Sequence, residues 1–195
     1  MTVPTGRRER KKAATRQKIA DTALRLFLER GYDEVGIREV AAEADVAVTT
    51  LFAHFASKEA LVFERDEDFE QGLVRAVTGR APHEPLIPAL RREIHAMVRH
   101  CTADGASPLW HMIDESSALR RYGESMRLRH AEALAAAIAA DPELAQTETA
   151  SATIARFVID AYSLAREAAD PEAAVDEIFR MIEAAWEATR PGVPA

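Results

Sequence analysis

The 195-residue sequence predicts an all-α protein of about nine helices, and three observations support this class. Apolar residues recur at i, i+3, i+4 and i+7 along most of the chain, which is the spacing of one face of an α-helix. Beyond residue 80 there is neither the alternating pattern of a strand nor a Gly-rich phosphate loop. Hydrophobic residues make up 48% and charged residues 29%, as in an ordinary globular protein.

Charge is distributed unevenly along the chain, whose formal net charge is -7. Residues 1–65 contain 12 Lys and Arg against 10 Asp and Glu, whereas residues 66–195 contain 13 against 22. A short basic region before an acidic body predicts one surface for a polyanion and a second surface for another partner. A solubilising tail is the alternative interpretation of the basic residues taken alone.

The compartment is predicted from three absences. No apolar run approaches the roughly 18 residues of a membrane span, and the N-terminus lacks the apolar core of a signal peptide. The single Cys101 cannot form an intrachain disulfide, which agrees with a reducing compartment. We therefore expect a cytoplasmic protein without a membrane partner.

The first predicted helix covers about residues 15–30 and follows a basic arm, residues 1–14, that we expect to be disordered. Thr15 fits its N-cap and Gly31 its end. A short second helix over about 37–44 precedes Asp45, where the chain must turn and where Asp tolerates a left-handed backbone. The inward faces of these two helices contain Ile19, Ala23, Leu26, Phe27, Ile37, Val40, Ala41 and Ala44.

The third helix lies in residues 46–57, VAVTTLFAHFAS, the longest stretch of the chain without Asp, Glu, Lys or Arg. Its apolar stripe, most of which we expect to face inward, contains Val48, Leu51, Phe52 and Phe55. The complementary face contains Thr49, Thr50, Ala53 and His54, and none of these repels a phosphate. Two short helices joined by a tight turn predict a helix-turn-helix unit over residues 15–60, whose second short helix fits the major groove. A chance pattern within a small helical bundle is the alternative.

A longer helix over about 57–77 is expected next, with Ser57 as its cap and Lys58 in its first turn. A lysine in the first turn interacts unfavourably with the helix dipole. This cost is explained if Lys58 and the helix N-terminus both face an external anion.

The N-terminal segment resembles the TetR-type one-component transcriptional regulators over about 50 positions. The matching residues are Thr15, Arg16, Ile19, Ala23, Leu26, Phe27, Gly31, Tyr32, Ile37, Arg38, Val40, Ala41, Ala44, Val46, Thr50, Leu51, His54, Phe55, Lys58, Glu59 and Leu61. The resemblance implies that the helix at about 47–54 reads bases, and that Lys58 and the start of the first helix hold phosphates. The expected DNA contacts are Arg7, Arg8, Arg10, Lys11, Lys12, Thr15, Arg16, Arg38, Val48, Thr49, Thr50, Phe52, Ala53, His54 and Lys58.

Three departures from the family pattern concern this surface. Gly36 stands where a Ser or Thr cap is usual, and Phe52 stands where a Tyr hydroxyl commonly meets a phosphate. Ala47 and Val48 replace a Ser and its polar neighbour, which leaves base contacts mainly to Thr49 and Thr50. Specificity from two threonines is expected to be modest for each half-site.

Residues 61–195 predict a larger helical domain for ligand binding and dimerisation, and Pro82, Gly123, Pro142 and Pro171 mark its expected breaks. The last two helices are expected to form half of a four-helix bundle across a two-fold axis, or else to be plain core. The expected interface residues are Ile154, Val158, Ala161, Ala165, Ile178, Phe179, Ile182 and Trp186. The candidate pocket residues are His95, Arg99, Trp110, Asp114, Met126, Phe157 and Tyr162, for each of which plain packing or an ion pair is the alternative.

These expectations combine into a homodimeric repressor that a small-molecule inducer releases from an inverted-repeat operator in double-stranded DNA. The alternative is a helical small-molecule-binding protein with a degenerate DNA-binding head. His111, Asp114 and Glu115 have spacing that allows a metal, but no second cluster supports it, so we expect neither a metal nor a cofactor. No recognisable nucleophile constellation is present, so we expect no enzyme.

Overall fold

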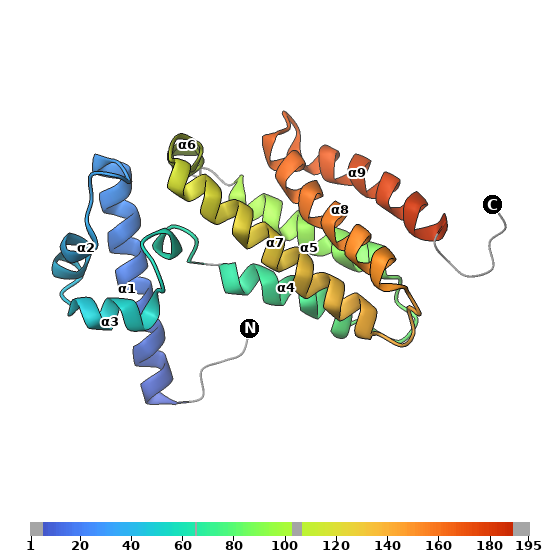
Figure 1. Cartoon of the computed structure of the whole chain (residues 1–195), viewed down its shortest axis with the longest axis horizontal. Helices are drawn as coiled ribbons and strands as arrows, with labels where there is room; N and C mark the ends of the chain where they lie inside the picture. The colour runs from blue at the N-terminus through green and yellow to red at the C-terminus, as the bar shows by residue number, and fades with distance from the viewer. Residues whose placement is uncertain (1–5, 65, 103–106, 189–195) are drawn as a thin grey trace. The chain divides into compact units, whose positions relative to one another are not determined.

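The computed structural model describes residues 6–64, 66–102 and 107–188. Within these ranges every regular element is helical, in agreement with the all-α prediction (Figure 1). The elements are α1 (Arg7–Arg30), α2 (Ile37–Glu43), α3 (Val48–His54), the 3-10 helix η1 (Glu59–Leu61), α4 (Asp66–Thr78), α5 (Leu86–Cys101), α6 (Ser107–Glu115), α7 (Ser117–Ala140), α8 (Glu148–Glu167) and α9 (Pro171–Ala188). No described helix is long and apolar enough to cross a membrane.

The chain divides into two compact units. The first unit comprises Met1–Glu64 and Pro108–Tyr122, and the second comprises Arg65–Ser107 and Gly123–Ala195. Each unit has its own hydrophobic core. The first core therefore combines α1, α2 and α3 with apolar residues of α6 and the start of α7.

In the second unit α5 packs against α4, α8 and α9, and α8 packs along α9. The apolar stripe of α5 is buried, with Leu90, Ile94 and Val98 fully enclosed. Arg80, just after α4, joins the end of α4 to the end of α7. Its guanidinium donates to the carbonyls of Val77 and Glu84 and forms an ion pair with Asp141.

Helix α1 is longer than the sequence predicted. It begins at Arg7, with Gly6 as its N-cap, so residues 7–14, expected to be a disordered arm, are helical. Thr15 is consequently not a cap, and its hydroxyl donates to the carbonyl of Lys11 one turn earlier. The extension is physically reasonable because Arg, Lys and Ala are strong helix formers.

The single helix expected over 57–77 is instead η1 followed by α4. Lys58 rather than Ser57 is the N-cap of η1, and Ser57 Oγ accepts from the N–H of Ala60 at 3.3 Å. The change of element coincides with a change of core, since Leu61 lies in the first core and Leu73 in the second.

Two other predicted breaks differ from the structure, whereas the third holds. Helix α7 runs through Gly123 without interruption. Pro142 lies in a loop before α8, whose N-cap is Thr147, with the hydroxyl accepting from the N–H of Ala150 at 3.1 Å. Pro171 does open α9.

Candidate nucleic-acid interface

The turn between α2 and α3 gives the helix-turn-helix its shape. Asp45 has a φ of 52°, which confirms the predicted left-handed turn residue. The N–H of Val46 donates to the carbonyl of Ala41 at 2.9 Å and so closes the end of α2. Gly36 is the N-cap of α2 and makes no side-chain cap hydrogen bond, as its lack of a side chain predicts.

Helix α3 has a buried side and an exposed side. Leu51 is fully buried, and Phe55, directly after the helix, is 2% exposed. Phe52 departs from the inward stripe and is 50% exposed. Thr49 and Ala53 are also exposed, whereas Val48, Thr50 and His54 are half-buried. The exposed side of α3 is therefore small, apolar or hydroxyl-bearing, and it has no charged side chain.

Arg16, an expected phosphate contact, is held within the first unit. Its guanidinium carbon lies 4.2 Å from the centroid of the Phe55 ring. One nitrogen donates to the carbonyl of His54 and the other to the carbonyl of Glu64 at 3.1 Å. This arginine satisfies carbonyls at the end of α3 and beyond η1, so much of its donor capacity is used inside the unit.

Lys58, the second expected phosphate contact, also points inward. Its ammonium donates to the carbonyl of Tyr32 and lies 4.1 Å from the centroid of the Tyr32 ring. The Tyr32 hydroxyl donates to Glu59 Oε1 at 3.0 Å. Burial lowers the pKa of Lys58, while Asp33, Glu59 and Glu34 oppose that shift. Sequence reasoning missed this cluster because its members meet only in the fold.

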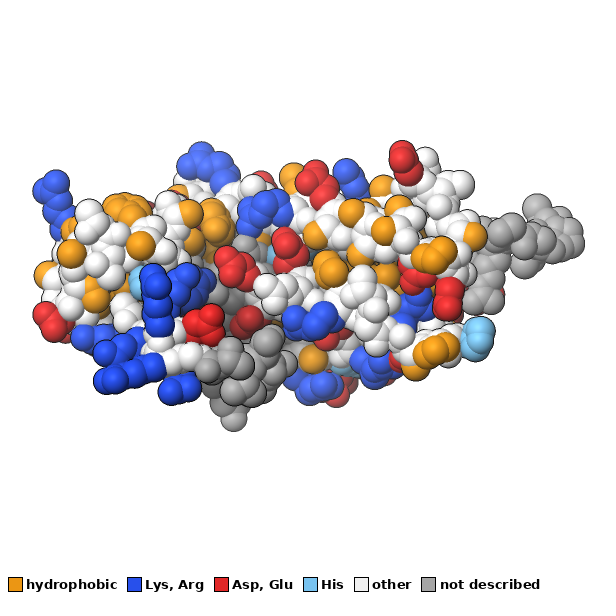
Figure 2. Space-filling model, turned by 90° about the horizontal axis from the view of Figure 1, so that it is seen from below, with side chains coloured by type: hydrophobic (Ala, Val, Ile, Leu, Met, Phe, Trp, Pro, Cys, Tyr) orange, Lys and Arg blue, Asp and Glu red, His pale blue; other side chains and the backbone are white. Residues whose placement is uncertain are grey.

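The N-terminal turns of α1 flank α3 with positive charge. Burial lowers the pKa of His54, and the charges of Lys12 and Arg16 lower it further, which favours a neutral imidazole. Its Nδ1 is buried without a hydrogen-bond partner. Arg7, Arg8, Arg10, Lys11 and Lys12 are all exposed on α1, and Figure 2, seen from the end where α1 begins, shows Lys and Arg side chains gathered there. Arg38 is exposed on α2.

The comparisons with known proteins agree with this geometry. Residues 19–64 match the family model described as bacterial regulatory proteins, tetR family. The N-terminal segment of the chain therefore matches the tetR family. Two relatives, each 30% identical, are the HTH-type transcriptional regulator TcmR of Streptomyces glaucescens, over 110 residues, and the HTH-type transcriptional repressor DhaR of Mycobacterium sp. (strain GP1), over 77 residues.

Both alignments with these relatives are partial. They cover 55% and 40% of this chain, and the chain spans 49% of TcmR and 38% of DhaR. A crystal structure of a TetR-family regulator from Streptomyces coelicolor A3 matches the fold with a TM-score of 0.63 at 17% identity, covering 89% of this chain and 94% of that one. The likeness of fold to that structure therefore covers residues of both units.

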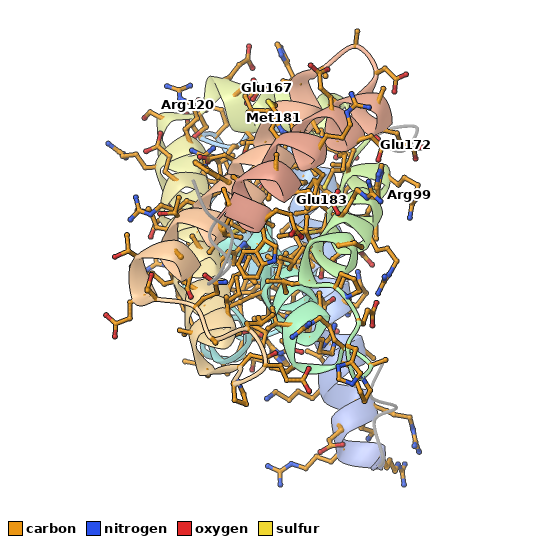
Figure 3. All side chains as sticks on the ribbon, turned by 90° about the vertical axis from the view of Figure 1, so that its right-hand side faces the viewer. Arg99, Arg120, Glu167, Glu172, Met181 and Glu183 are labelled. Atoms are coloured by element: carbon orange, nitrogen blue, oxygen red, sulfur yellow. The ribbon has the colours of Figure 1, made fainter. Side chains whose placement is uncertain are left out.

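The expected interface residues are mostly buried within a single chain. Ile154, Val158, Ala161, Ala165, Phe179, Ile182 and Trp186 are all 4% exposed or less, and Ile178 is half-buried. Their stripes face the core of the second unit, because α5 covers that side of α8 and α9. The opposite faces expose Phe157 and Leu164 on α8 and Met181 on α9. The Met181 side chain is labelled in Figure 3.

The candidate pocket residues are divided between the two units. Trp110 and Asp114 lie on α6 in the first unit, and the other five lie in the second. Three of these five have polar partners: His95 Nε2 is 3.0 Å from Asp176 Oδ1, Arg99 is 3.8 Å from Glu172, and the Tyr162 hydroxyl donates to Cys101 Sγ at 2.9 Å. Met126 is half-buried and Phe157 is exposed.

The second unit nevertheless contains polar atoms that suit a bound molecule or water. Ser151 Oγ and His95 Nδ1 are both buried, and neither has a hydrogen-bond partner within the protein. Buried polar atoms of this kind are uncommon, because leaving them unpaired costs about 1–3 kcal/mol. A hollow of about 420 Å³ lies elsewhere in the unit, lined by residues of the α4 and α7 ends that include Val77, Arg80, Ala137 and Asp141.

Metal binding has little support among the described residues. His111 Nε2 and Glu115 Oε1 lie 3.2 Å apart on the exposed face of α6. In the described parts of the chain no group of three or more His, Cys, Asp or Glu is placed to hold a metal ion.

Proposed function

We propose that the protein is a homodimeric, sequence-specific DNA-binding regulator, most simply a repressor that leaves an inverted-repeat operator when the second unit binds a small molecule. The observation that carries the proposal is the exposed, uncharged side of α3 beside the basic turns of α1. A polyanion is attracted by the basic turns, while the α3 side offers no charge that repels it. The names of TcmR and DhaR, a regulator and a repressor, support the same activity.

The decisive experiment is selection of bound DNA from a random double-stranded pool at about 0.15 M salt, a concentration at which nonspecific binding is weak. Enrichment of an inverted repeat, with half-sites one helical turn or a multiple apart, is expected for a two-fold dimer. Salt-sensitive binding without any enriched sequence would reject the proposal. It would favour the alternative, a small-molecule-binding protein with a degenerate DNA-binding head.

The proposed dimer surface is the outer face of α8 and α9, marked by Phe157, Leu164 and Met181. Phe157 and Leu164 are seven residues apart and so share one side of α8. Exposed apolar side chains on adjacent helices are typical of an interface when they recur on one face.

The dimer test uses matched exposed positions. Leu164→Glu and Met181→Glu should convert the protein to a monomer without unfolding it, because both side chains are more than half exposed in one chain. Leu128→Glu on α7, where Leu128 is 55% exposed, is the control and should leave the dimer intact. Sedimentation measures the outcome, and a dimer that survives both α8 and α9 changes would rule out this surface.

The proposed ligand response requires a molecule whose affinity differs between the DNA-binding conformation and another one. The buried Ser151 Oγ and His95 Nδ1 offer hydrogen-bonding capacity to such a molecule. A compound that lowers operator affinity for the natural protein, but has less effect on Ser151→Ala, would support this site. Equal effects on both proteins would exclude Ser151 from it.

A further inference from the structure

The outward side of α3 has a restricted chemistry. The exposed residues of the helix are Thr49, Phe52 and Ala53, and Thr50 beside them is half-buried. Their outermost groups are methyls, an aromatic ring and hydroxyls. A ring that is 50% exposed on an otherwise well-packed unit gains free energy when a partner covers it.

Each base pair presents a different set of groups in the major groove. Guanine is matched by Arg or Lys, adenine by Asn or Gln, and cytosine by Asp or Glu, while the thymine methyl is matched by Ala, Phe and the Thr methyl. Ser and Thr hydroxyls can bond to more than one base and so select none strongly. Residues 46–57 contain no Arg, Lys, Asn, Gln, Asp or Glu. Among the direct base matches, the side chains of α3 therefore favour thymine.

Neighbouring polar groups contribute little to the outward side of this helix. His54 is half-buried, its Nδ1 is enclosed, and its surroundings favour the neutral form. Arg16 is engaged with Phe55 and two backbone carbonyls. Arg38 lies on α2, the first helix of the motif, which in helix-turn-helix proteins crosses the DNA backbone.

We infer that α3 recognises the C5-methyl groups of thymines, through the Thr49 methyl, the Phe52 ring and the Ala53 methyl. The half-site is then A·T at the base pairs facing these side chains. This inference rests on the proposed DNA-binding function and adds the class of sequence that the surface selects.

Replacement of thymidine by deoxyuridine tests the methyl contact directly, because the two nucleosides differ only by the C5-methyl of the base and pair identically with adenine. A fragment enriched from the random pool is synthesised with deoxyuridine at one position at a time, and the affinity of the full chain is measured. Each contacted methyl should be worth about fourfold in affinity, which is the effect of one buried CH₂ group.

A matched pair of variants at exposed Thr49 identifies the contact on the protein side. Thr49→Val keeps the methyl and loses the hydroxyl, so it should retain affinity and sensitivity to deoxyuridine. Thr49→Ser keeps the hydroxyl and loses the methyl, so it should bind about fourfold more weakly to the thymine fragment. At its own base pair the Ser variant should no longer distinguish thymine from deoxyuridine.

The results separate this inference from the proposed function. A selected sequence whose affinity is unchanged by every deoxyuridine substitution would overturn methyl recognition while leaving specific DNA binding established. Loss of affinity in Thr49→Val but not in Thr49→Ser would likewise overturn it in favour of a hydroxyl contact. Failure to enrich any sequence would reject the DNA-binding function and the inference together.

Discussion

The guanidinium of Arg16 lies over the ring of Phe55, with 4.2 Å between the guanidinium carbon and the ring centroid. The same group donates to the carbonyls of His54 and Glu64, so it connects α1 with the end of α3 and with the segment after η1. Arg16, which the sequence assigns to a phosphate, therefore stabilises the end of α3 within the protein.

Arg16→Ala should lower the free energy of unfolding of the first unit by about 2 kcal/mol, because a cation–π contact and two hydrogen bonds are lost. Denaturant unfolding followed by the fluorescence of Trp110, which lies in the first unit, measures this in a Trp186→Phe background. Exposed Lys12→Ala is the control and should change stability by less than about 0.5 kcal/mol. Unchanged stability in Arg16→Ala would contradict the structural role.

Lys58→Met should reduce the stability of the first unit by about 1–3 kcal/mol, since the Tyr32 carbonyl loses its donor. The salt dependence of DNA binding should stay the same, because the ammonium faces Tyr32 rather than solvent. Lys12→Gln should instead reduce the salt slope by about 0.9, the value for one phosphate contact. A slope that falls in Lys58→Met would restore the sequence-based assignment of Lys58 to a phosphate.

The first unit should lose stability as the pH falls below about 6.5, the ordinary pKa of histidine. Burial, Lys12 and Arg16 lower the pKa of His54 in the folded protein, so the unfolded chain binds the proton first and is favoured by acid. The loss continues until the pH reaches the lowered folded-state value and then levels off. Urea unfolding monitored by Trp110 between pH 7.5 and 5 measures the slope.

Variants identify which residue causes the dependence of stability on pH. His54→Gln should remove most of it, and Lys12→Gln should reduce it because one of the two neighbouring positive charges is gone. His111→Gln, on the exposed face of α6 in the same unit, should leave it in place. A slope that survives in His54→Gln would place the proton uptake elsewhere.

Arg80→Ala should destabilise the second unit by about 3 kcal/mol. The Arg80 and Asp141 side chains are only 7% and 17% exposed, so the change leaves an enclosed carboxylate without its ion-pair partner. Arg99→Ala breaks the ion pair between Arg99 and Glu172, in which each side chain is 58% exposed. This change should lower the free energy of unfolding by less than about 1 kcal/mol. Thermal unfolding followed by the fluorescence of Trp186 compares the stability of the two variants. Equal losses of stability would show that the enclosed ion pair contributes no more than the exposed one.

Sequence reasoning succeeded where the signal is local. The left-handed turn at Asp45 follows from the short distance between two apolar stripes, and the structure confirms it. The buried positions of α5 likewise follow from helical spacing alone. The resemblance of the N-terminal segment to the TetR-type regulators is supported by the family-model match over residues 19–64.

The same reasoning failed where the answer depends on which surface covers a side chain. The stripe containing Ile154 and Val158 was correctly predicted to be buried, but periodicity does not tell burial within one chain from burial against a second copy. The assignment of Lys58 and Arg16 to phosphates rests on their charge and stays a prediction. Their contacts with Tyr32 and Phe55 could not be predicted, because these partners are remote in sequence. Composition also suggested a disordered arm where strong helix formers extend α1.

The first unit is interrupted in the sequence, and this sets the order in which it can be completed during synthesis. Its core includes Met112, Ile113 and Leu119, which the ribosome adds only after the 43 residues between Glu64 and Pro108. A nascent chain that ends at residue 64 lacks these three side chains, so α1, α2 and α3 remain without part of their apolar cover. Final packing of the DNA-binding unit must therefore wait until translation has passed residue 122, when most of the chain already exists.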